Sequence, residues 1–325
     1  MSVETARAFW VTRPGHGAIR EETLPPARPG DVLVRSLYSG ISRGTETLVF
    51  NGMVPETQFQ AMRAPFQAGD FPAPVKYGYI NVGCIEEGPV ERLGETVFCL
   101  HPHQDWFRLP GSAAVPLPAG LAPERAVLTA NMETAINACW DAGPMAGDRI
   151  AILGAGVLGL LTAWLCRQVP GTQVTLVDIN PAREAVSHAL EIQFTTIAAN
   201  VSDADLVIHA SGRPEGLTQA LQCAGVESTV LELSWYGNQG VTLPLGEAFH
   251  SRRLSLKSSQ VGRIPSRRQA RWDHRRRLGL ALDLLRAPEL DLLITDESDF
   301  DTLPTVMTRL SCGDTDTLCH RIRYP

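Results

Sequence analysis

Three closely spaced glycines provide the strongest chemical signal in this sequence of 325 residues. The run Gly154-Ala155-Gly156-Val157-Leu158-Gly159 follows an apolar stretch at 149–153 and precedes a helical pattern at 160–167. In this context the first glycine suits a tight turn, the second lets a pyrophosphate approach the backbone, and the third lets a helix pack closely on a strand. Free N–H groups and the positive dipole at the helix start would hold the anion. The pattern predicts a dinucleotide site that includes Gly154, Gly156, Val157, Leu158 and Gly159.

An acidic residue stands where such a site needs one. Asp178 ends the next predicted strand, 19 residues after Gly159 (178 − 159), close to the usual offset of about 20 for the acid that binds the ribose hydroxyls. Its carboxylate would repel a 2′-phosphate, which favours NAD(H) over NADP(H). Arg183 and Ser211 complete the predicted cofactor-binding set. The alternative is that the glycines only make a tight turn and Asp178 is a solvated loop acid.

The elements that must position these residues alternate between strands and helices. Strand patterns at 149–153, 173–178, 206–210 and 228–233 alternate with helical patterns, of which the clearest cover 181–190 and 214–224. Such alternation is typical of βαβ units and a parallel sheet. Helical patterns also cover 124–142 and 273–285. The first ~120 residues instead hold short β-type runs interrupted by prolines, which favours an irregular β-barrel.

These segments together resemble the medium-chain dehydrogenase/reductase superfamily over nearly the whole chain. The similarity is carried by Gly30–Arg35, Tyr38–Ser42, Ala135–Asp148 and Ser258–Gln260. It implies an α/β protein with a GroES-like β-barrel catalytic domain at residues 1–122 and a Rossmann NAD(P)-binding domain at 123–262. Residues 263–325 would return to the catalytic domain. The loop at 40–46 is also similar, over a few residues only, to that of bacteriochlorophyllide 2-hydroxyethyl dehydrogenases.

The resemblance places three unusual side chains where zinc-dependent members bind catalytic zinc. Ser42 stands in place of a Cys, Tyr79 in place of the His of a G-H-E motif, and approximately Ala130 in place of a third Cys, Asp or Glu. Zinc prefers thiolate, imidazole and carboxylate donors. The four-cysteine lobe that carries the family's structural zinc is missing from the sequence as well. We therefore expect no metal and a zinc-independent enzyme.

Without zinc, a side chain must stabilise or protonate the oxygen on which charge develops as the hydride moves. Tyr79 is the leading candidate, because a phenol can donate from the position that zinc would occupy. Its pKa of about 10 would need lowering, by Lys76 or by the oxidised nicotinamide. The alternative is that Tyr79 only positions the substrate.

Other polar residues near these positions in the sequence are further catalytic candidates. Ser42 and Thr45 would relay or donate hydrogen bonds, or else satisfy the local backbone. His103 is a candidate general acid, because imidazole titrates near neutrality. His101 and His103 lack a third metal ligand at a suitable spacing, and either could instead be structural. Whether Tyr79 or a histidine donates the proton stays open.

Several charged and apolar features allow two interpretations each. Glu46 is a substrate ligand or a surface acid. Glu133 and Asn131 either face the nicotinamide or lie solvated on a helix. The segment 43–78 lines the substrate cleft or forms a dimer contact. The seven arginines between 263 and 277 bind an anionic ligand or form a solvated helix face with a few ion pairs, and the second interpretation is favoured.

Composition excludes several protein classes. A chain with 44% apolar residues, 20% charged residues, net charge −6 and mean hydropathy −0.03 has enough core for two domains. These values argue against disorder and against nucleic-acid binding through overall charge. The sequence shows neither a secretory signal nor an apolar stretch of the ~20 residues that a spanning helix needs. We expect a cytoplasmic protein whose seven cysteines are reduced.

The sequence thus predicts a zinc-independent, NAD(H)-dependent oxidoreductase. It would transfer a hydride between the nicotinamide and an alcohol or ketone carbon of a small molecule, with an anionic substrate as one option. One alternative is an NADPH-dependent quinone or enone reductase. Another is a non-catalytic dinucleotide-binding sensor or nucleic-acid-binding relative. We expect a homodimer with neither a membrane nor a nucleic acid as partner.

Overall fold

Two compact units make up the protein. The computed structural model describes residues 3–313 and 316–325. The first unit combines the chain up to Ala130 with the chain from Leu282 onward, and the second comprises Asn131–Ala281. From the sequence, we expect the boundaries between the units after residues 122 and 262. Residues 263–281 therefore lie in the second unit, where Arg277 binds Glu133 through a buried ion pair.

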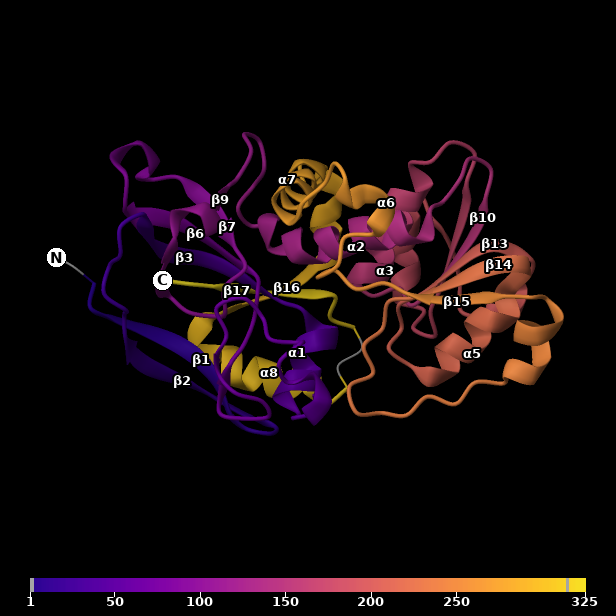
Figure 1. Ribbon diagram of the computed structural model, residues 1–325, viewed down its shortest axis with the longest axis horizontal. Helices are drawn as coiled ribbons and strands as arrows, with labels where there is room; N and C mark the ends of the chain where they lie inside the picture. The colour runs from indigo at the N-terminus through magenta and orange to yellow at the C-terminus, as the bar shows by residue number, and fades with distance from the viewer. Residues whose placement is uncertain (1–2, 314–315) are drawn as a thin grey trace. The chain divides into compact units, whose positions relative to one another are not determined.

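The first unit is built mainly from strands (Figure 1). One sheet has the order β2-β1-β5-β4, formed by His16–Thr23, Thr5–Arg13, Val75–Lys76 and Ala68–Gly69. The other has the order β16-β17-β3-β6-β7-β9, formed by Ile294–Asp299, Cys319–Arg323, Asp31–Ile41, Asn81–Glu87, Thr96–Cys99 and Val115–Pro116. Strand β8 (Trp106–Pro110) also pairs with β3. Both ends of the chain thus contribute strands to one sheet, as the resemblance implies.

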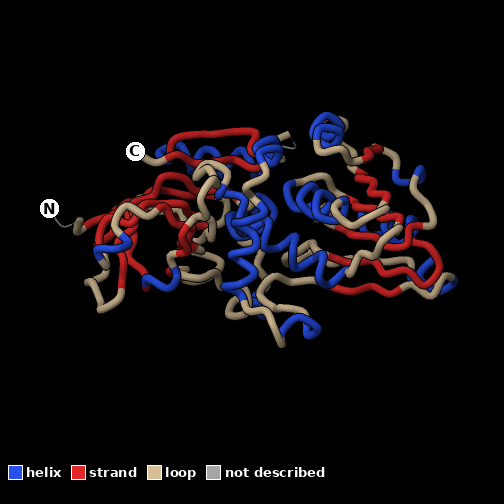
Figure 2. The backbone as a smooth tube through the Cα atoms, turned by 90° about the horizontal axis from the view of Figure 1, so that it is seen from above, coloured by secondary structure: helices blue, strands red, loops and turns tan. Residues whose placement is uncertain are grey.

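Alternating apolar residues explain the core of this second sheet. Val32 and Val34 of β3 are fully buried and pack with Ile85 of β6, Val97 of β7 and Phe107 of β8. Helices are short in this unit (Figure 2). They are α1 (Arg43–Phe50), α8 (Leu303–Ser311) and 3-10 turns at Glu56–Gln58, Val90–Arg92, Gly111–Ala113, Ala126–Leu128, Pro288–Leu293 and Phe300–Thr302.

The second unit contains a parallel sheet with the order β12-β11-β10-β13-β14-β15. Its strands are Gln193–Thr195, Gln173–Val177, Arg149–Leu153, Ala204–His209, Ala224–Glu232 and Ser255–Ser258. Numbered from β10 within the unit, the order is 3-2-1-4-5-6, which is that of a Rossmann sheet. The order reverses between β10 and β13, and ligands of such sheets bind where the carboxyl ends of the strands meet this reversal.

Helices connect the parallel strands or precede and follow them in the sequence (Figure 1). They are α2 (Thr129–Ala142), α3 (Val157–Arg167), α4 (Arg183–Ala189), α5 (Pro214–Cys223), α6 (Ser266–Gln269) and α7 (His274–Leu284), with a 3-10 turn at Ala198–Asn200 and a π-helical turn at Leu245–Phe249. The predicted fold class is confirmed, and the predicted elements differ mainly at their ends. Among residues 3–313 and 316–325, no helix combines the length and the apolar character needed to cross a membrane.

Candidate functional site

The glycine loop adopts a conformation that only glycine allows. Gly154 follows β10 with φ +110°, and a Cβ there would lie 2.6 Å from the backbone nitrogen of Ser211. A Cβ on Gly159 would lie 1.8 Å from the carbonyl oxygen of Gly154. These two glycines therefore let the loop fold back against the turn after β13 and let α3 start directly beside it.

The start of α3 is open. Gly156 is the N-cap of this helix, no side chain caps it, and a Cβ on Gly156 would meet nothing within 4 Å. Val157 and Leu158 form the first turn, whose N–H groups lack intrahelical partners in any α-helix. Uncapped amides beside open space fit a pyrophosphate. The loop from Gly154 to Gly159 and the first turn of α3 thus lie together within the second unit, and we refer to them as the cradle.

Asp178 is held rigidly at the end of β11. Its carboxylate accepts hydrogen bonds from the N–H of Ala155 at 2.7 Å and from the N–H of Asn180 at 2.9 Å. The negative charge therefore lies directly behind the glycine loop, as expected for a ribose ligand. Arg183, in contrast, is 5% exposed at the start of α4. Its burial leaves little of its side chain available to a ligand.

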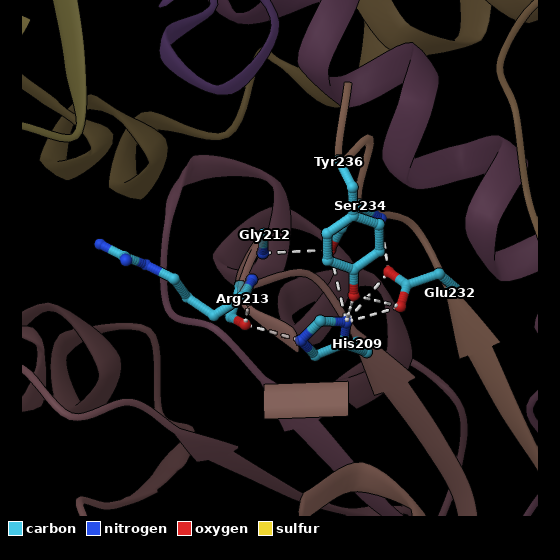
Figure 3. A network of polar contacts seen from close by, with 7 residues as sticks. His209, Gly212, Arg213, Glu232, Ser234 and Tyr236 are labelled. Carbon is cyan, nitrogen blue, oxygen red and sulfur yellow. Dashed lines mark hydrogen bonds and ion pairs between the residues drawn. The ribbon is translucent and has the colours of Figure 1, made fainter. Parts of the chain in front are cut away.

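Ser211 belongs to a polar network at the carboxyl ends of β13 and β14 (Figure 3). Its Oγ lies 2.6 Å from Nε2 of His209. Nδ1 of the same ring lies 2.8 Å from the Glu232 carboxylate, which also accepts a hydrogen bond from the Tyr236 hydroxyl at 2.9 Å. We refer to His209, Ser211, Glu232, Ser234 and Tyr236 as the β13–β14 network.

The first unit contains a second buried network, around Glu46 of α1. The Glu46 carboxylate accepts a hydrogen bond from the N–H of Ser42 at 2.8 Å and lies 2.9 Å from Nε2 of His103. Nδ1 of His103 lies 2.7 Å from the hydroxyl of Ser39, which contacts the Tyr324 hydroxyl at 3.0 Å. Glu46 is thus a buried network member and not a surface acid.

Tyr79 adjoins this network through hydrogen bonds with Ser42 and Thr45. Burial and the negative charge of Glu46 raise the pKa of Tyr79 to about 12, against a lowering by those two hydrogen bonds. We expected Lys76 to lower it, and this expectation is wrong, because the Lys76 ammonium is bound by Glu22 and by Gln104 at 2.8 Å. Tyr79 is therefore a protonated donor at neutral pH.

The histidines predicted as acids are not free to meet a substrate. His103 is 1% exposed and both of its ring nitrogens contact protein oxygens. A Cβ on Gly78 would lie 3.1 Å from the His103 ring, so Gly78 (φ +132°) allows this packing. His101 stacks on Phe107 with ring centroids 3.9 Å apart, and burial lowers its pKa to about 3. His101 is therefore a neutral packing residue.

The donor set at the expected zinc position does not fit zinc. Ser42 and Tyr79 offer hydroxyls that hydrogen-bond each other, and Ala130 offers only a methyl group. Glu46 and His103 are committed to one another. Within the described part of the chain, no three His, Cys, Asp or Glu side chains are grouped to hold a metal ion.

Three open features of the sequence now have positions. Glu133 binds the guanidinium of Arg277, which also donates to the carbonyl of Val261. Arg277 is 1% exposed, so this arginine forms one of the expected ion pairs but is not part of a solvated face. In the segment 43–78, Phe50 is buried within the first unit.

Several residues of the two networks were missed in the sequence, among them His209, Glu232, Ser234, Tyr236 and Tyr324. His209 and Glu232 end adjacent parallel strands, and Tyr324 lies one residue from the chain end. The available signal was a histidine that interrupts the apolar run 206–210 just before the Ser211-Gly212 turn. Nothing in the local sequence indicates that Tyr324 lies beside Ser39.

Comparisons with known proteins return dehydrogenases. The chain matches no established protein-family description. It is 28% identical over 117 residues to an L-threonine 3-dehydrogenase of Rhizobium rhizogenes, which covers 36% of this chain and 33% of that protein. It is 24% identical over 163 residues to a sorbitol dehydrogenase of Bos taurus, with coverages of 47% and 45%. The chain thus matches less than half of the length of either relative.

Solved structures match over nearly the whole chain. A protein of Escherichia coli CFT073 described as a short chain alcohol dehydrogenase, determined with NADH, superposes with a TM-score of 0.77 at 15% identity. The match covers 99% of this chain and 100% of that one. The chain therefore shares the fold of these dehydrogenase structures, with a GroES-like domain and a Rossmann domain.

Proposed function

We propose that the protein is a dehydrogenase that uses a nicotinamide dinucleotide and acts on an alcohol or ketone without zinc. The observation that carries this proposal is the open, uncapped start of α3 behind Gly156, in a fold shared with an NADH-bound alcohol dehydrogenase. The names of the curated relatives, threonine and sorbitol dehydrogenases, support chemistry at a CH–OH carbon.

The cofactor we propose is NAD(H). A bound nicotinamide ring supplies the hydride donor or acceptor for this chemistry. The amides of Val157 and Leu158 bind the pyrophosphate, and Asp178 accepts hydrogen bonds from the ribose. The same carboxylate disfavours a 2′-phosphate, because two negative charges would then lie in contact.

Tyr79 is the acid that we propose for ketone reduction. With a pKa of about 12 it holds its proton at neutral pH, yet it is a stronger acid than the product alcohol, so it can protonate the alkoxide that forms as hydride arrives. Ser42 and Thr45 hydrogen-bond the phenolic oxygen and stabilise it as the proton leaves. His103 contacts neither, so we assign it to holding Glu46 in place.

Zinc independence follows from the same residues. Two hydroxyls and a methyl group occupy the three positions at which the resemblance expects zinc ligands. In this proposal Tyr79, and not a zinc site, supplies the proton to the substrate oxygen.

One experiment tests these statements together. The purified enzyme, with and without EDTA, is assayed for NADH binding by fluorescence and for turnover of ketones, secondary alcohols and enones. We expect NADH binding, ketone turnover insensitive to EDTA, and a loss of about 100-fold or more in kcat for Tyr79→Phe, with the Kd for NADH unchanged. Tyr77→Phe, two residues away in the sequence, is the matched control.

Three results would contradict the proposal. Loss of turnover on removal of one bound zinc per chain would overturn the metal-free mechanism. Tighter binding of NADPH with enone turnover would favour the reductase alternative. An unchanged kcat in Tyr79→Phe would assign the proton to another group.

A further inference from the structure

The β13–β14 network joins a buried histidine to a serine beside the cofactor cradle (Figure 3). His209 is fully buried, whereas Ser211 is partly exposed, and a Cβ built on Gly154 would lie 2.6 Å from the backbone nitrogen of Ser211. His209 is the last residue of β13, and Ser211 follows it two residues later. A change in the charge of the His209 ring can therefore alter the hydrogen bonding of the Ser211 hydroxyl beside the cradle.

Helix α5 is shaped to allow this contact. A Cβ on Gly216 would lie 2.4 Å from Oγ of Ser211 and 2.6 Å from Nε2 of His209. Any other residue at this position would displace the hydrogen bond between them. The backbone of α5 thus covers one side of the bond and keeps water away from it.

The acceptors around His209 fix the proton on one ring nitrogen. The Glu232 carboxylate accepts hydrogen bonds from the N–H of Ser234 at 2.6 Å and from the Tyr236 hydroxyl. Burial and Glu232 raise the pKa of Tyr236, so this phenol keeps its proton. Since an ionised carboxylate only accepts, Nδ1 of His209 carries a proton toward Glu232 in either charge state.

The state of the other ring nitrogen decides what Ser211 offers to a ligand. A hydroxyl has one proton to donate and two lone pairs. One lone pair of Ser211 accepts the N–H of Arg213 at 3.2 Å. When His209 is charged, Nε2–H takes the second lone pair, and only the Ser211 proton remains for a ligand. When His209 is neutral, that proton is donated to Nε2, and only a lone pair remains.

We propose that His209 is a protonation-dependent positioning residue which makes Ser211 a hydrogen-bond donor to the dinucleotide only when the imidazole is charged. The ligand atom is an acceptor oxygen of the cofactor, of the phosphate, ribose or carboxamide class. The inference rests on the proposed dinucleotide binding. It predicts tighter cofactor binding at low pH and weaker binding as the pH rises through the titration of His209.

The sequence Ser–His–carboxylate also occurs at serine nucleophiles, but acyl transfer does not suit this site. The N–H of Gly212 donates a hydrogen bond to Oγ of Ser234 at 3.1 Å, and the N–H of Arg213 donates one to Oγ of Ser211. Neither of the two amides next to Ser211 is thus available to stabilise an oxyanion.

Few other charges act on this ring. Glu232 of β14 and the Tyr236 hydroxyl, 3.4 Å from Nδ1, face it from one side. From α5, the carboxylate of Glu215 acts on Tyr236. The side chain of Arg213 points away from the ring (Figure 3).

The test is the Kd for NADH, measured by fluorescence between pH 6 and 9 on the full-length protein. NADH is used because, unlike NADPH, it has no 2′-phosphate that titrates in this range. The wild type should bind about fivefold more weakly at pH 9 than at pH 6, which corresponds to one hydrogen bond. Ser211→Ala should bind about fivefold more weakly than the wild type at pH 6 and equally well or better at pH 9.

Three further variants separate the proposal from simple damage. His209→Gln cannot titrate and should show a flat profile, and Ser211→Thr, which keeps the hydroxyl, should retain the wild-type slope. His188→Gln removes an exposed histidine of the same unit and should also retain it. If His209→Gln fails to fold, the two Ser211 variants decide alone.

The outcomes distinguish the two proposals. A wild type that binds NADH with a flat profile, or a slope that persists in Ser211→Ala, overturns the role of His209 and leaves the dehydrogenase proposal intact. A wild type that binds no NADH at any pH overturns the proposed function itself, and this inference with it.

Discussion

The two units each contain a buried hydrogen-bonded series of glutamate, histidine and serine beside a tyrosine. The two series differ in which member lies at the candidate site. In the first unit Ser39 is fully buried, and Glu46 is the member that meets Ser42 and the neighbourhood of Tyr79. In the second unit the serine, Ser211, is the member at the cradle, and Glu232 binds Tyr236. The same set of groups thus presents a carboxylate in one place and a hydroxyl in the other.

The two glutamates also differ in how far they are buried. The side chains of His103 and Glu46 are 1% and 4% exposed, against 0% and 12% for His209 and Glu232. A carboxylate that is nearly dry must be fully satisfied by its partners, whereas one that reaches water tolerates a change in the charge of its partner. The carboxylate of the first network therefore depends on its protein partners, whereas that of the second also meets water.

Truncating the two glutamates should separate the networks most strongly. Glu46→Ala should lower the free energy of unfolding by about 3–5 kcal/mol, because it leaves His103 buried without its acceptor. Glu232→Ala should lower it less, since water can enter beside the partly exposed position. Urea denaturation of both variants checks this, with Glu46→Gln and Glu232→Gln as controls that keep an acceptor. Equal losses would remove the distinction between a dry network and a hydrated one.

Two alanine substitutions in the glycine loop test the surroundings of Ser211. Gly154→Ala should destabilise the protein by about 1–3 kcal/mol, because of its positive φ and the clash with the Ser211 backbone. Gly156→Ala should leave the unfolding free energy unchanged, because its Cβ enters open space, yet weaken NADH binding about tenfold or more. Thermal unfolding and fluorescence titration give the two readouts. Normal NADH affinity in Gly156→Ala would place the pyrophosphate elsewhere.

Asp178→Asn tests whether the carboxylate of Asp178 and the imidazole of His209 act independently on cofactor binding. Removing this charge should shift the ratio of the NADPH and NADH dissociation constants about tenfold toward NADPH, without changing the pH dependence of NADH binding. Glu184→Gln, which removes an exposed charge from α4, is the control. An altered pH slope in Asp178→Asn would mean that the two charges are coupled.

Alkaline pH should have the smallest effect, through the tyrosines of the two networks. Burial raises the pKa of Tyr79 to about 12, so its folded value exceeds that of the unfolded chain. The unfolded state releases its proton first, and stability is therefore full below pH ~10 and falls between pH 10 and 12. Urea midpoints from pH 9 to 11.5 should fall less steeply for Tyr79→Phe and Tyr236→Phe than for the wild type. Parallel curves would show that neither phenol is desolvated.

The sequence predicted the second unit better than the first, for a physical reason. The glycine spacing and the offset of Asp178 are local patterns, because one βα turn and one following strand build the cradle. The Glu46 network joins α1, β3, the loop of His103 and the C-terminal Tyr324, and no local pattern encodes such contacts. Tyr79 was identified by position, but its raised pKa depends on its own burial and on the charge of Glu46, which no local pattern places beside it.

Glycine at position 216 makes the arrangement of the second unit recognisable in other sequences. A chain with the same device must place His and Ser two residues apart at a strand end, Gly five residues after that Ser and Glu 21 residues after it, as in positions 209, 211, 216 and 232. A homologue that keeps the glycine loop but has alanine in place of Gly216 would still hold a dinucleotide. Its affinity for the dinucleotide would no longer depend on pH, because the added Cβ would displace the hydrogen bond between the histidine and the serine.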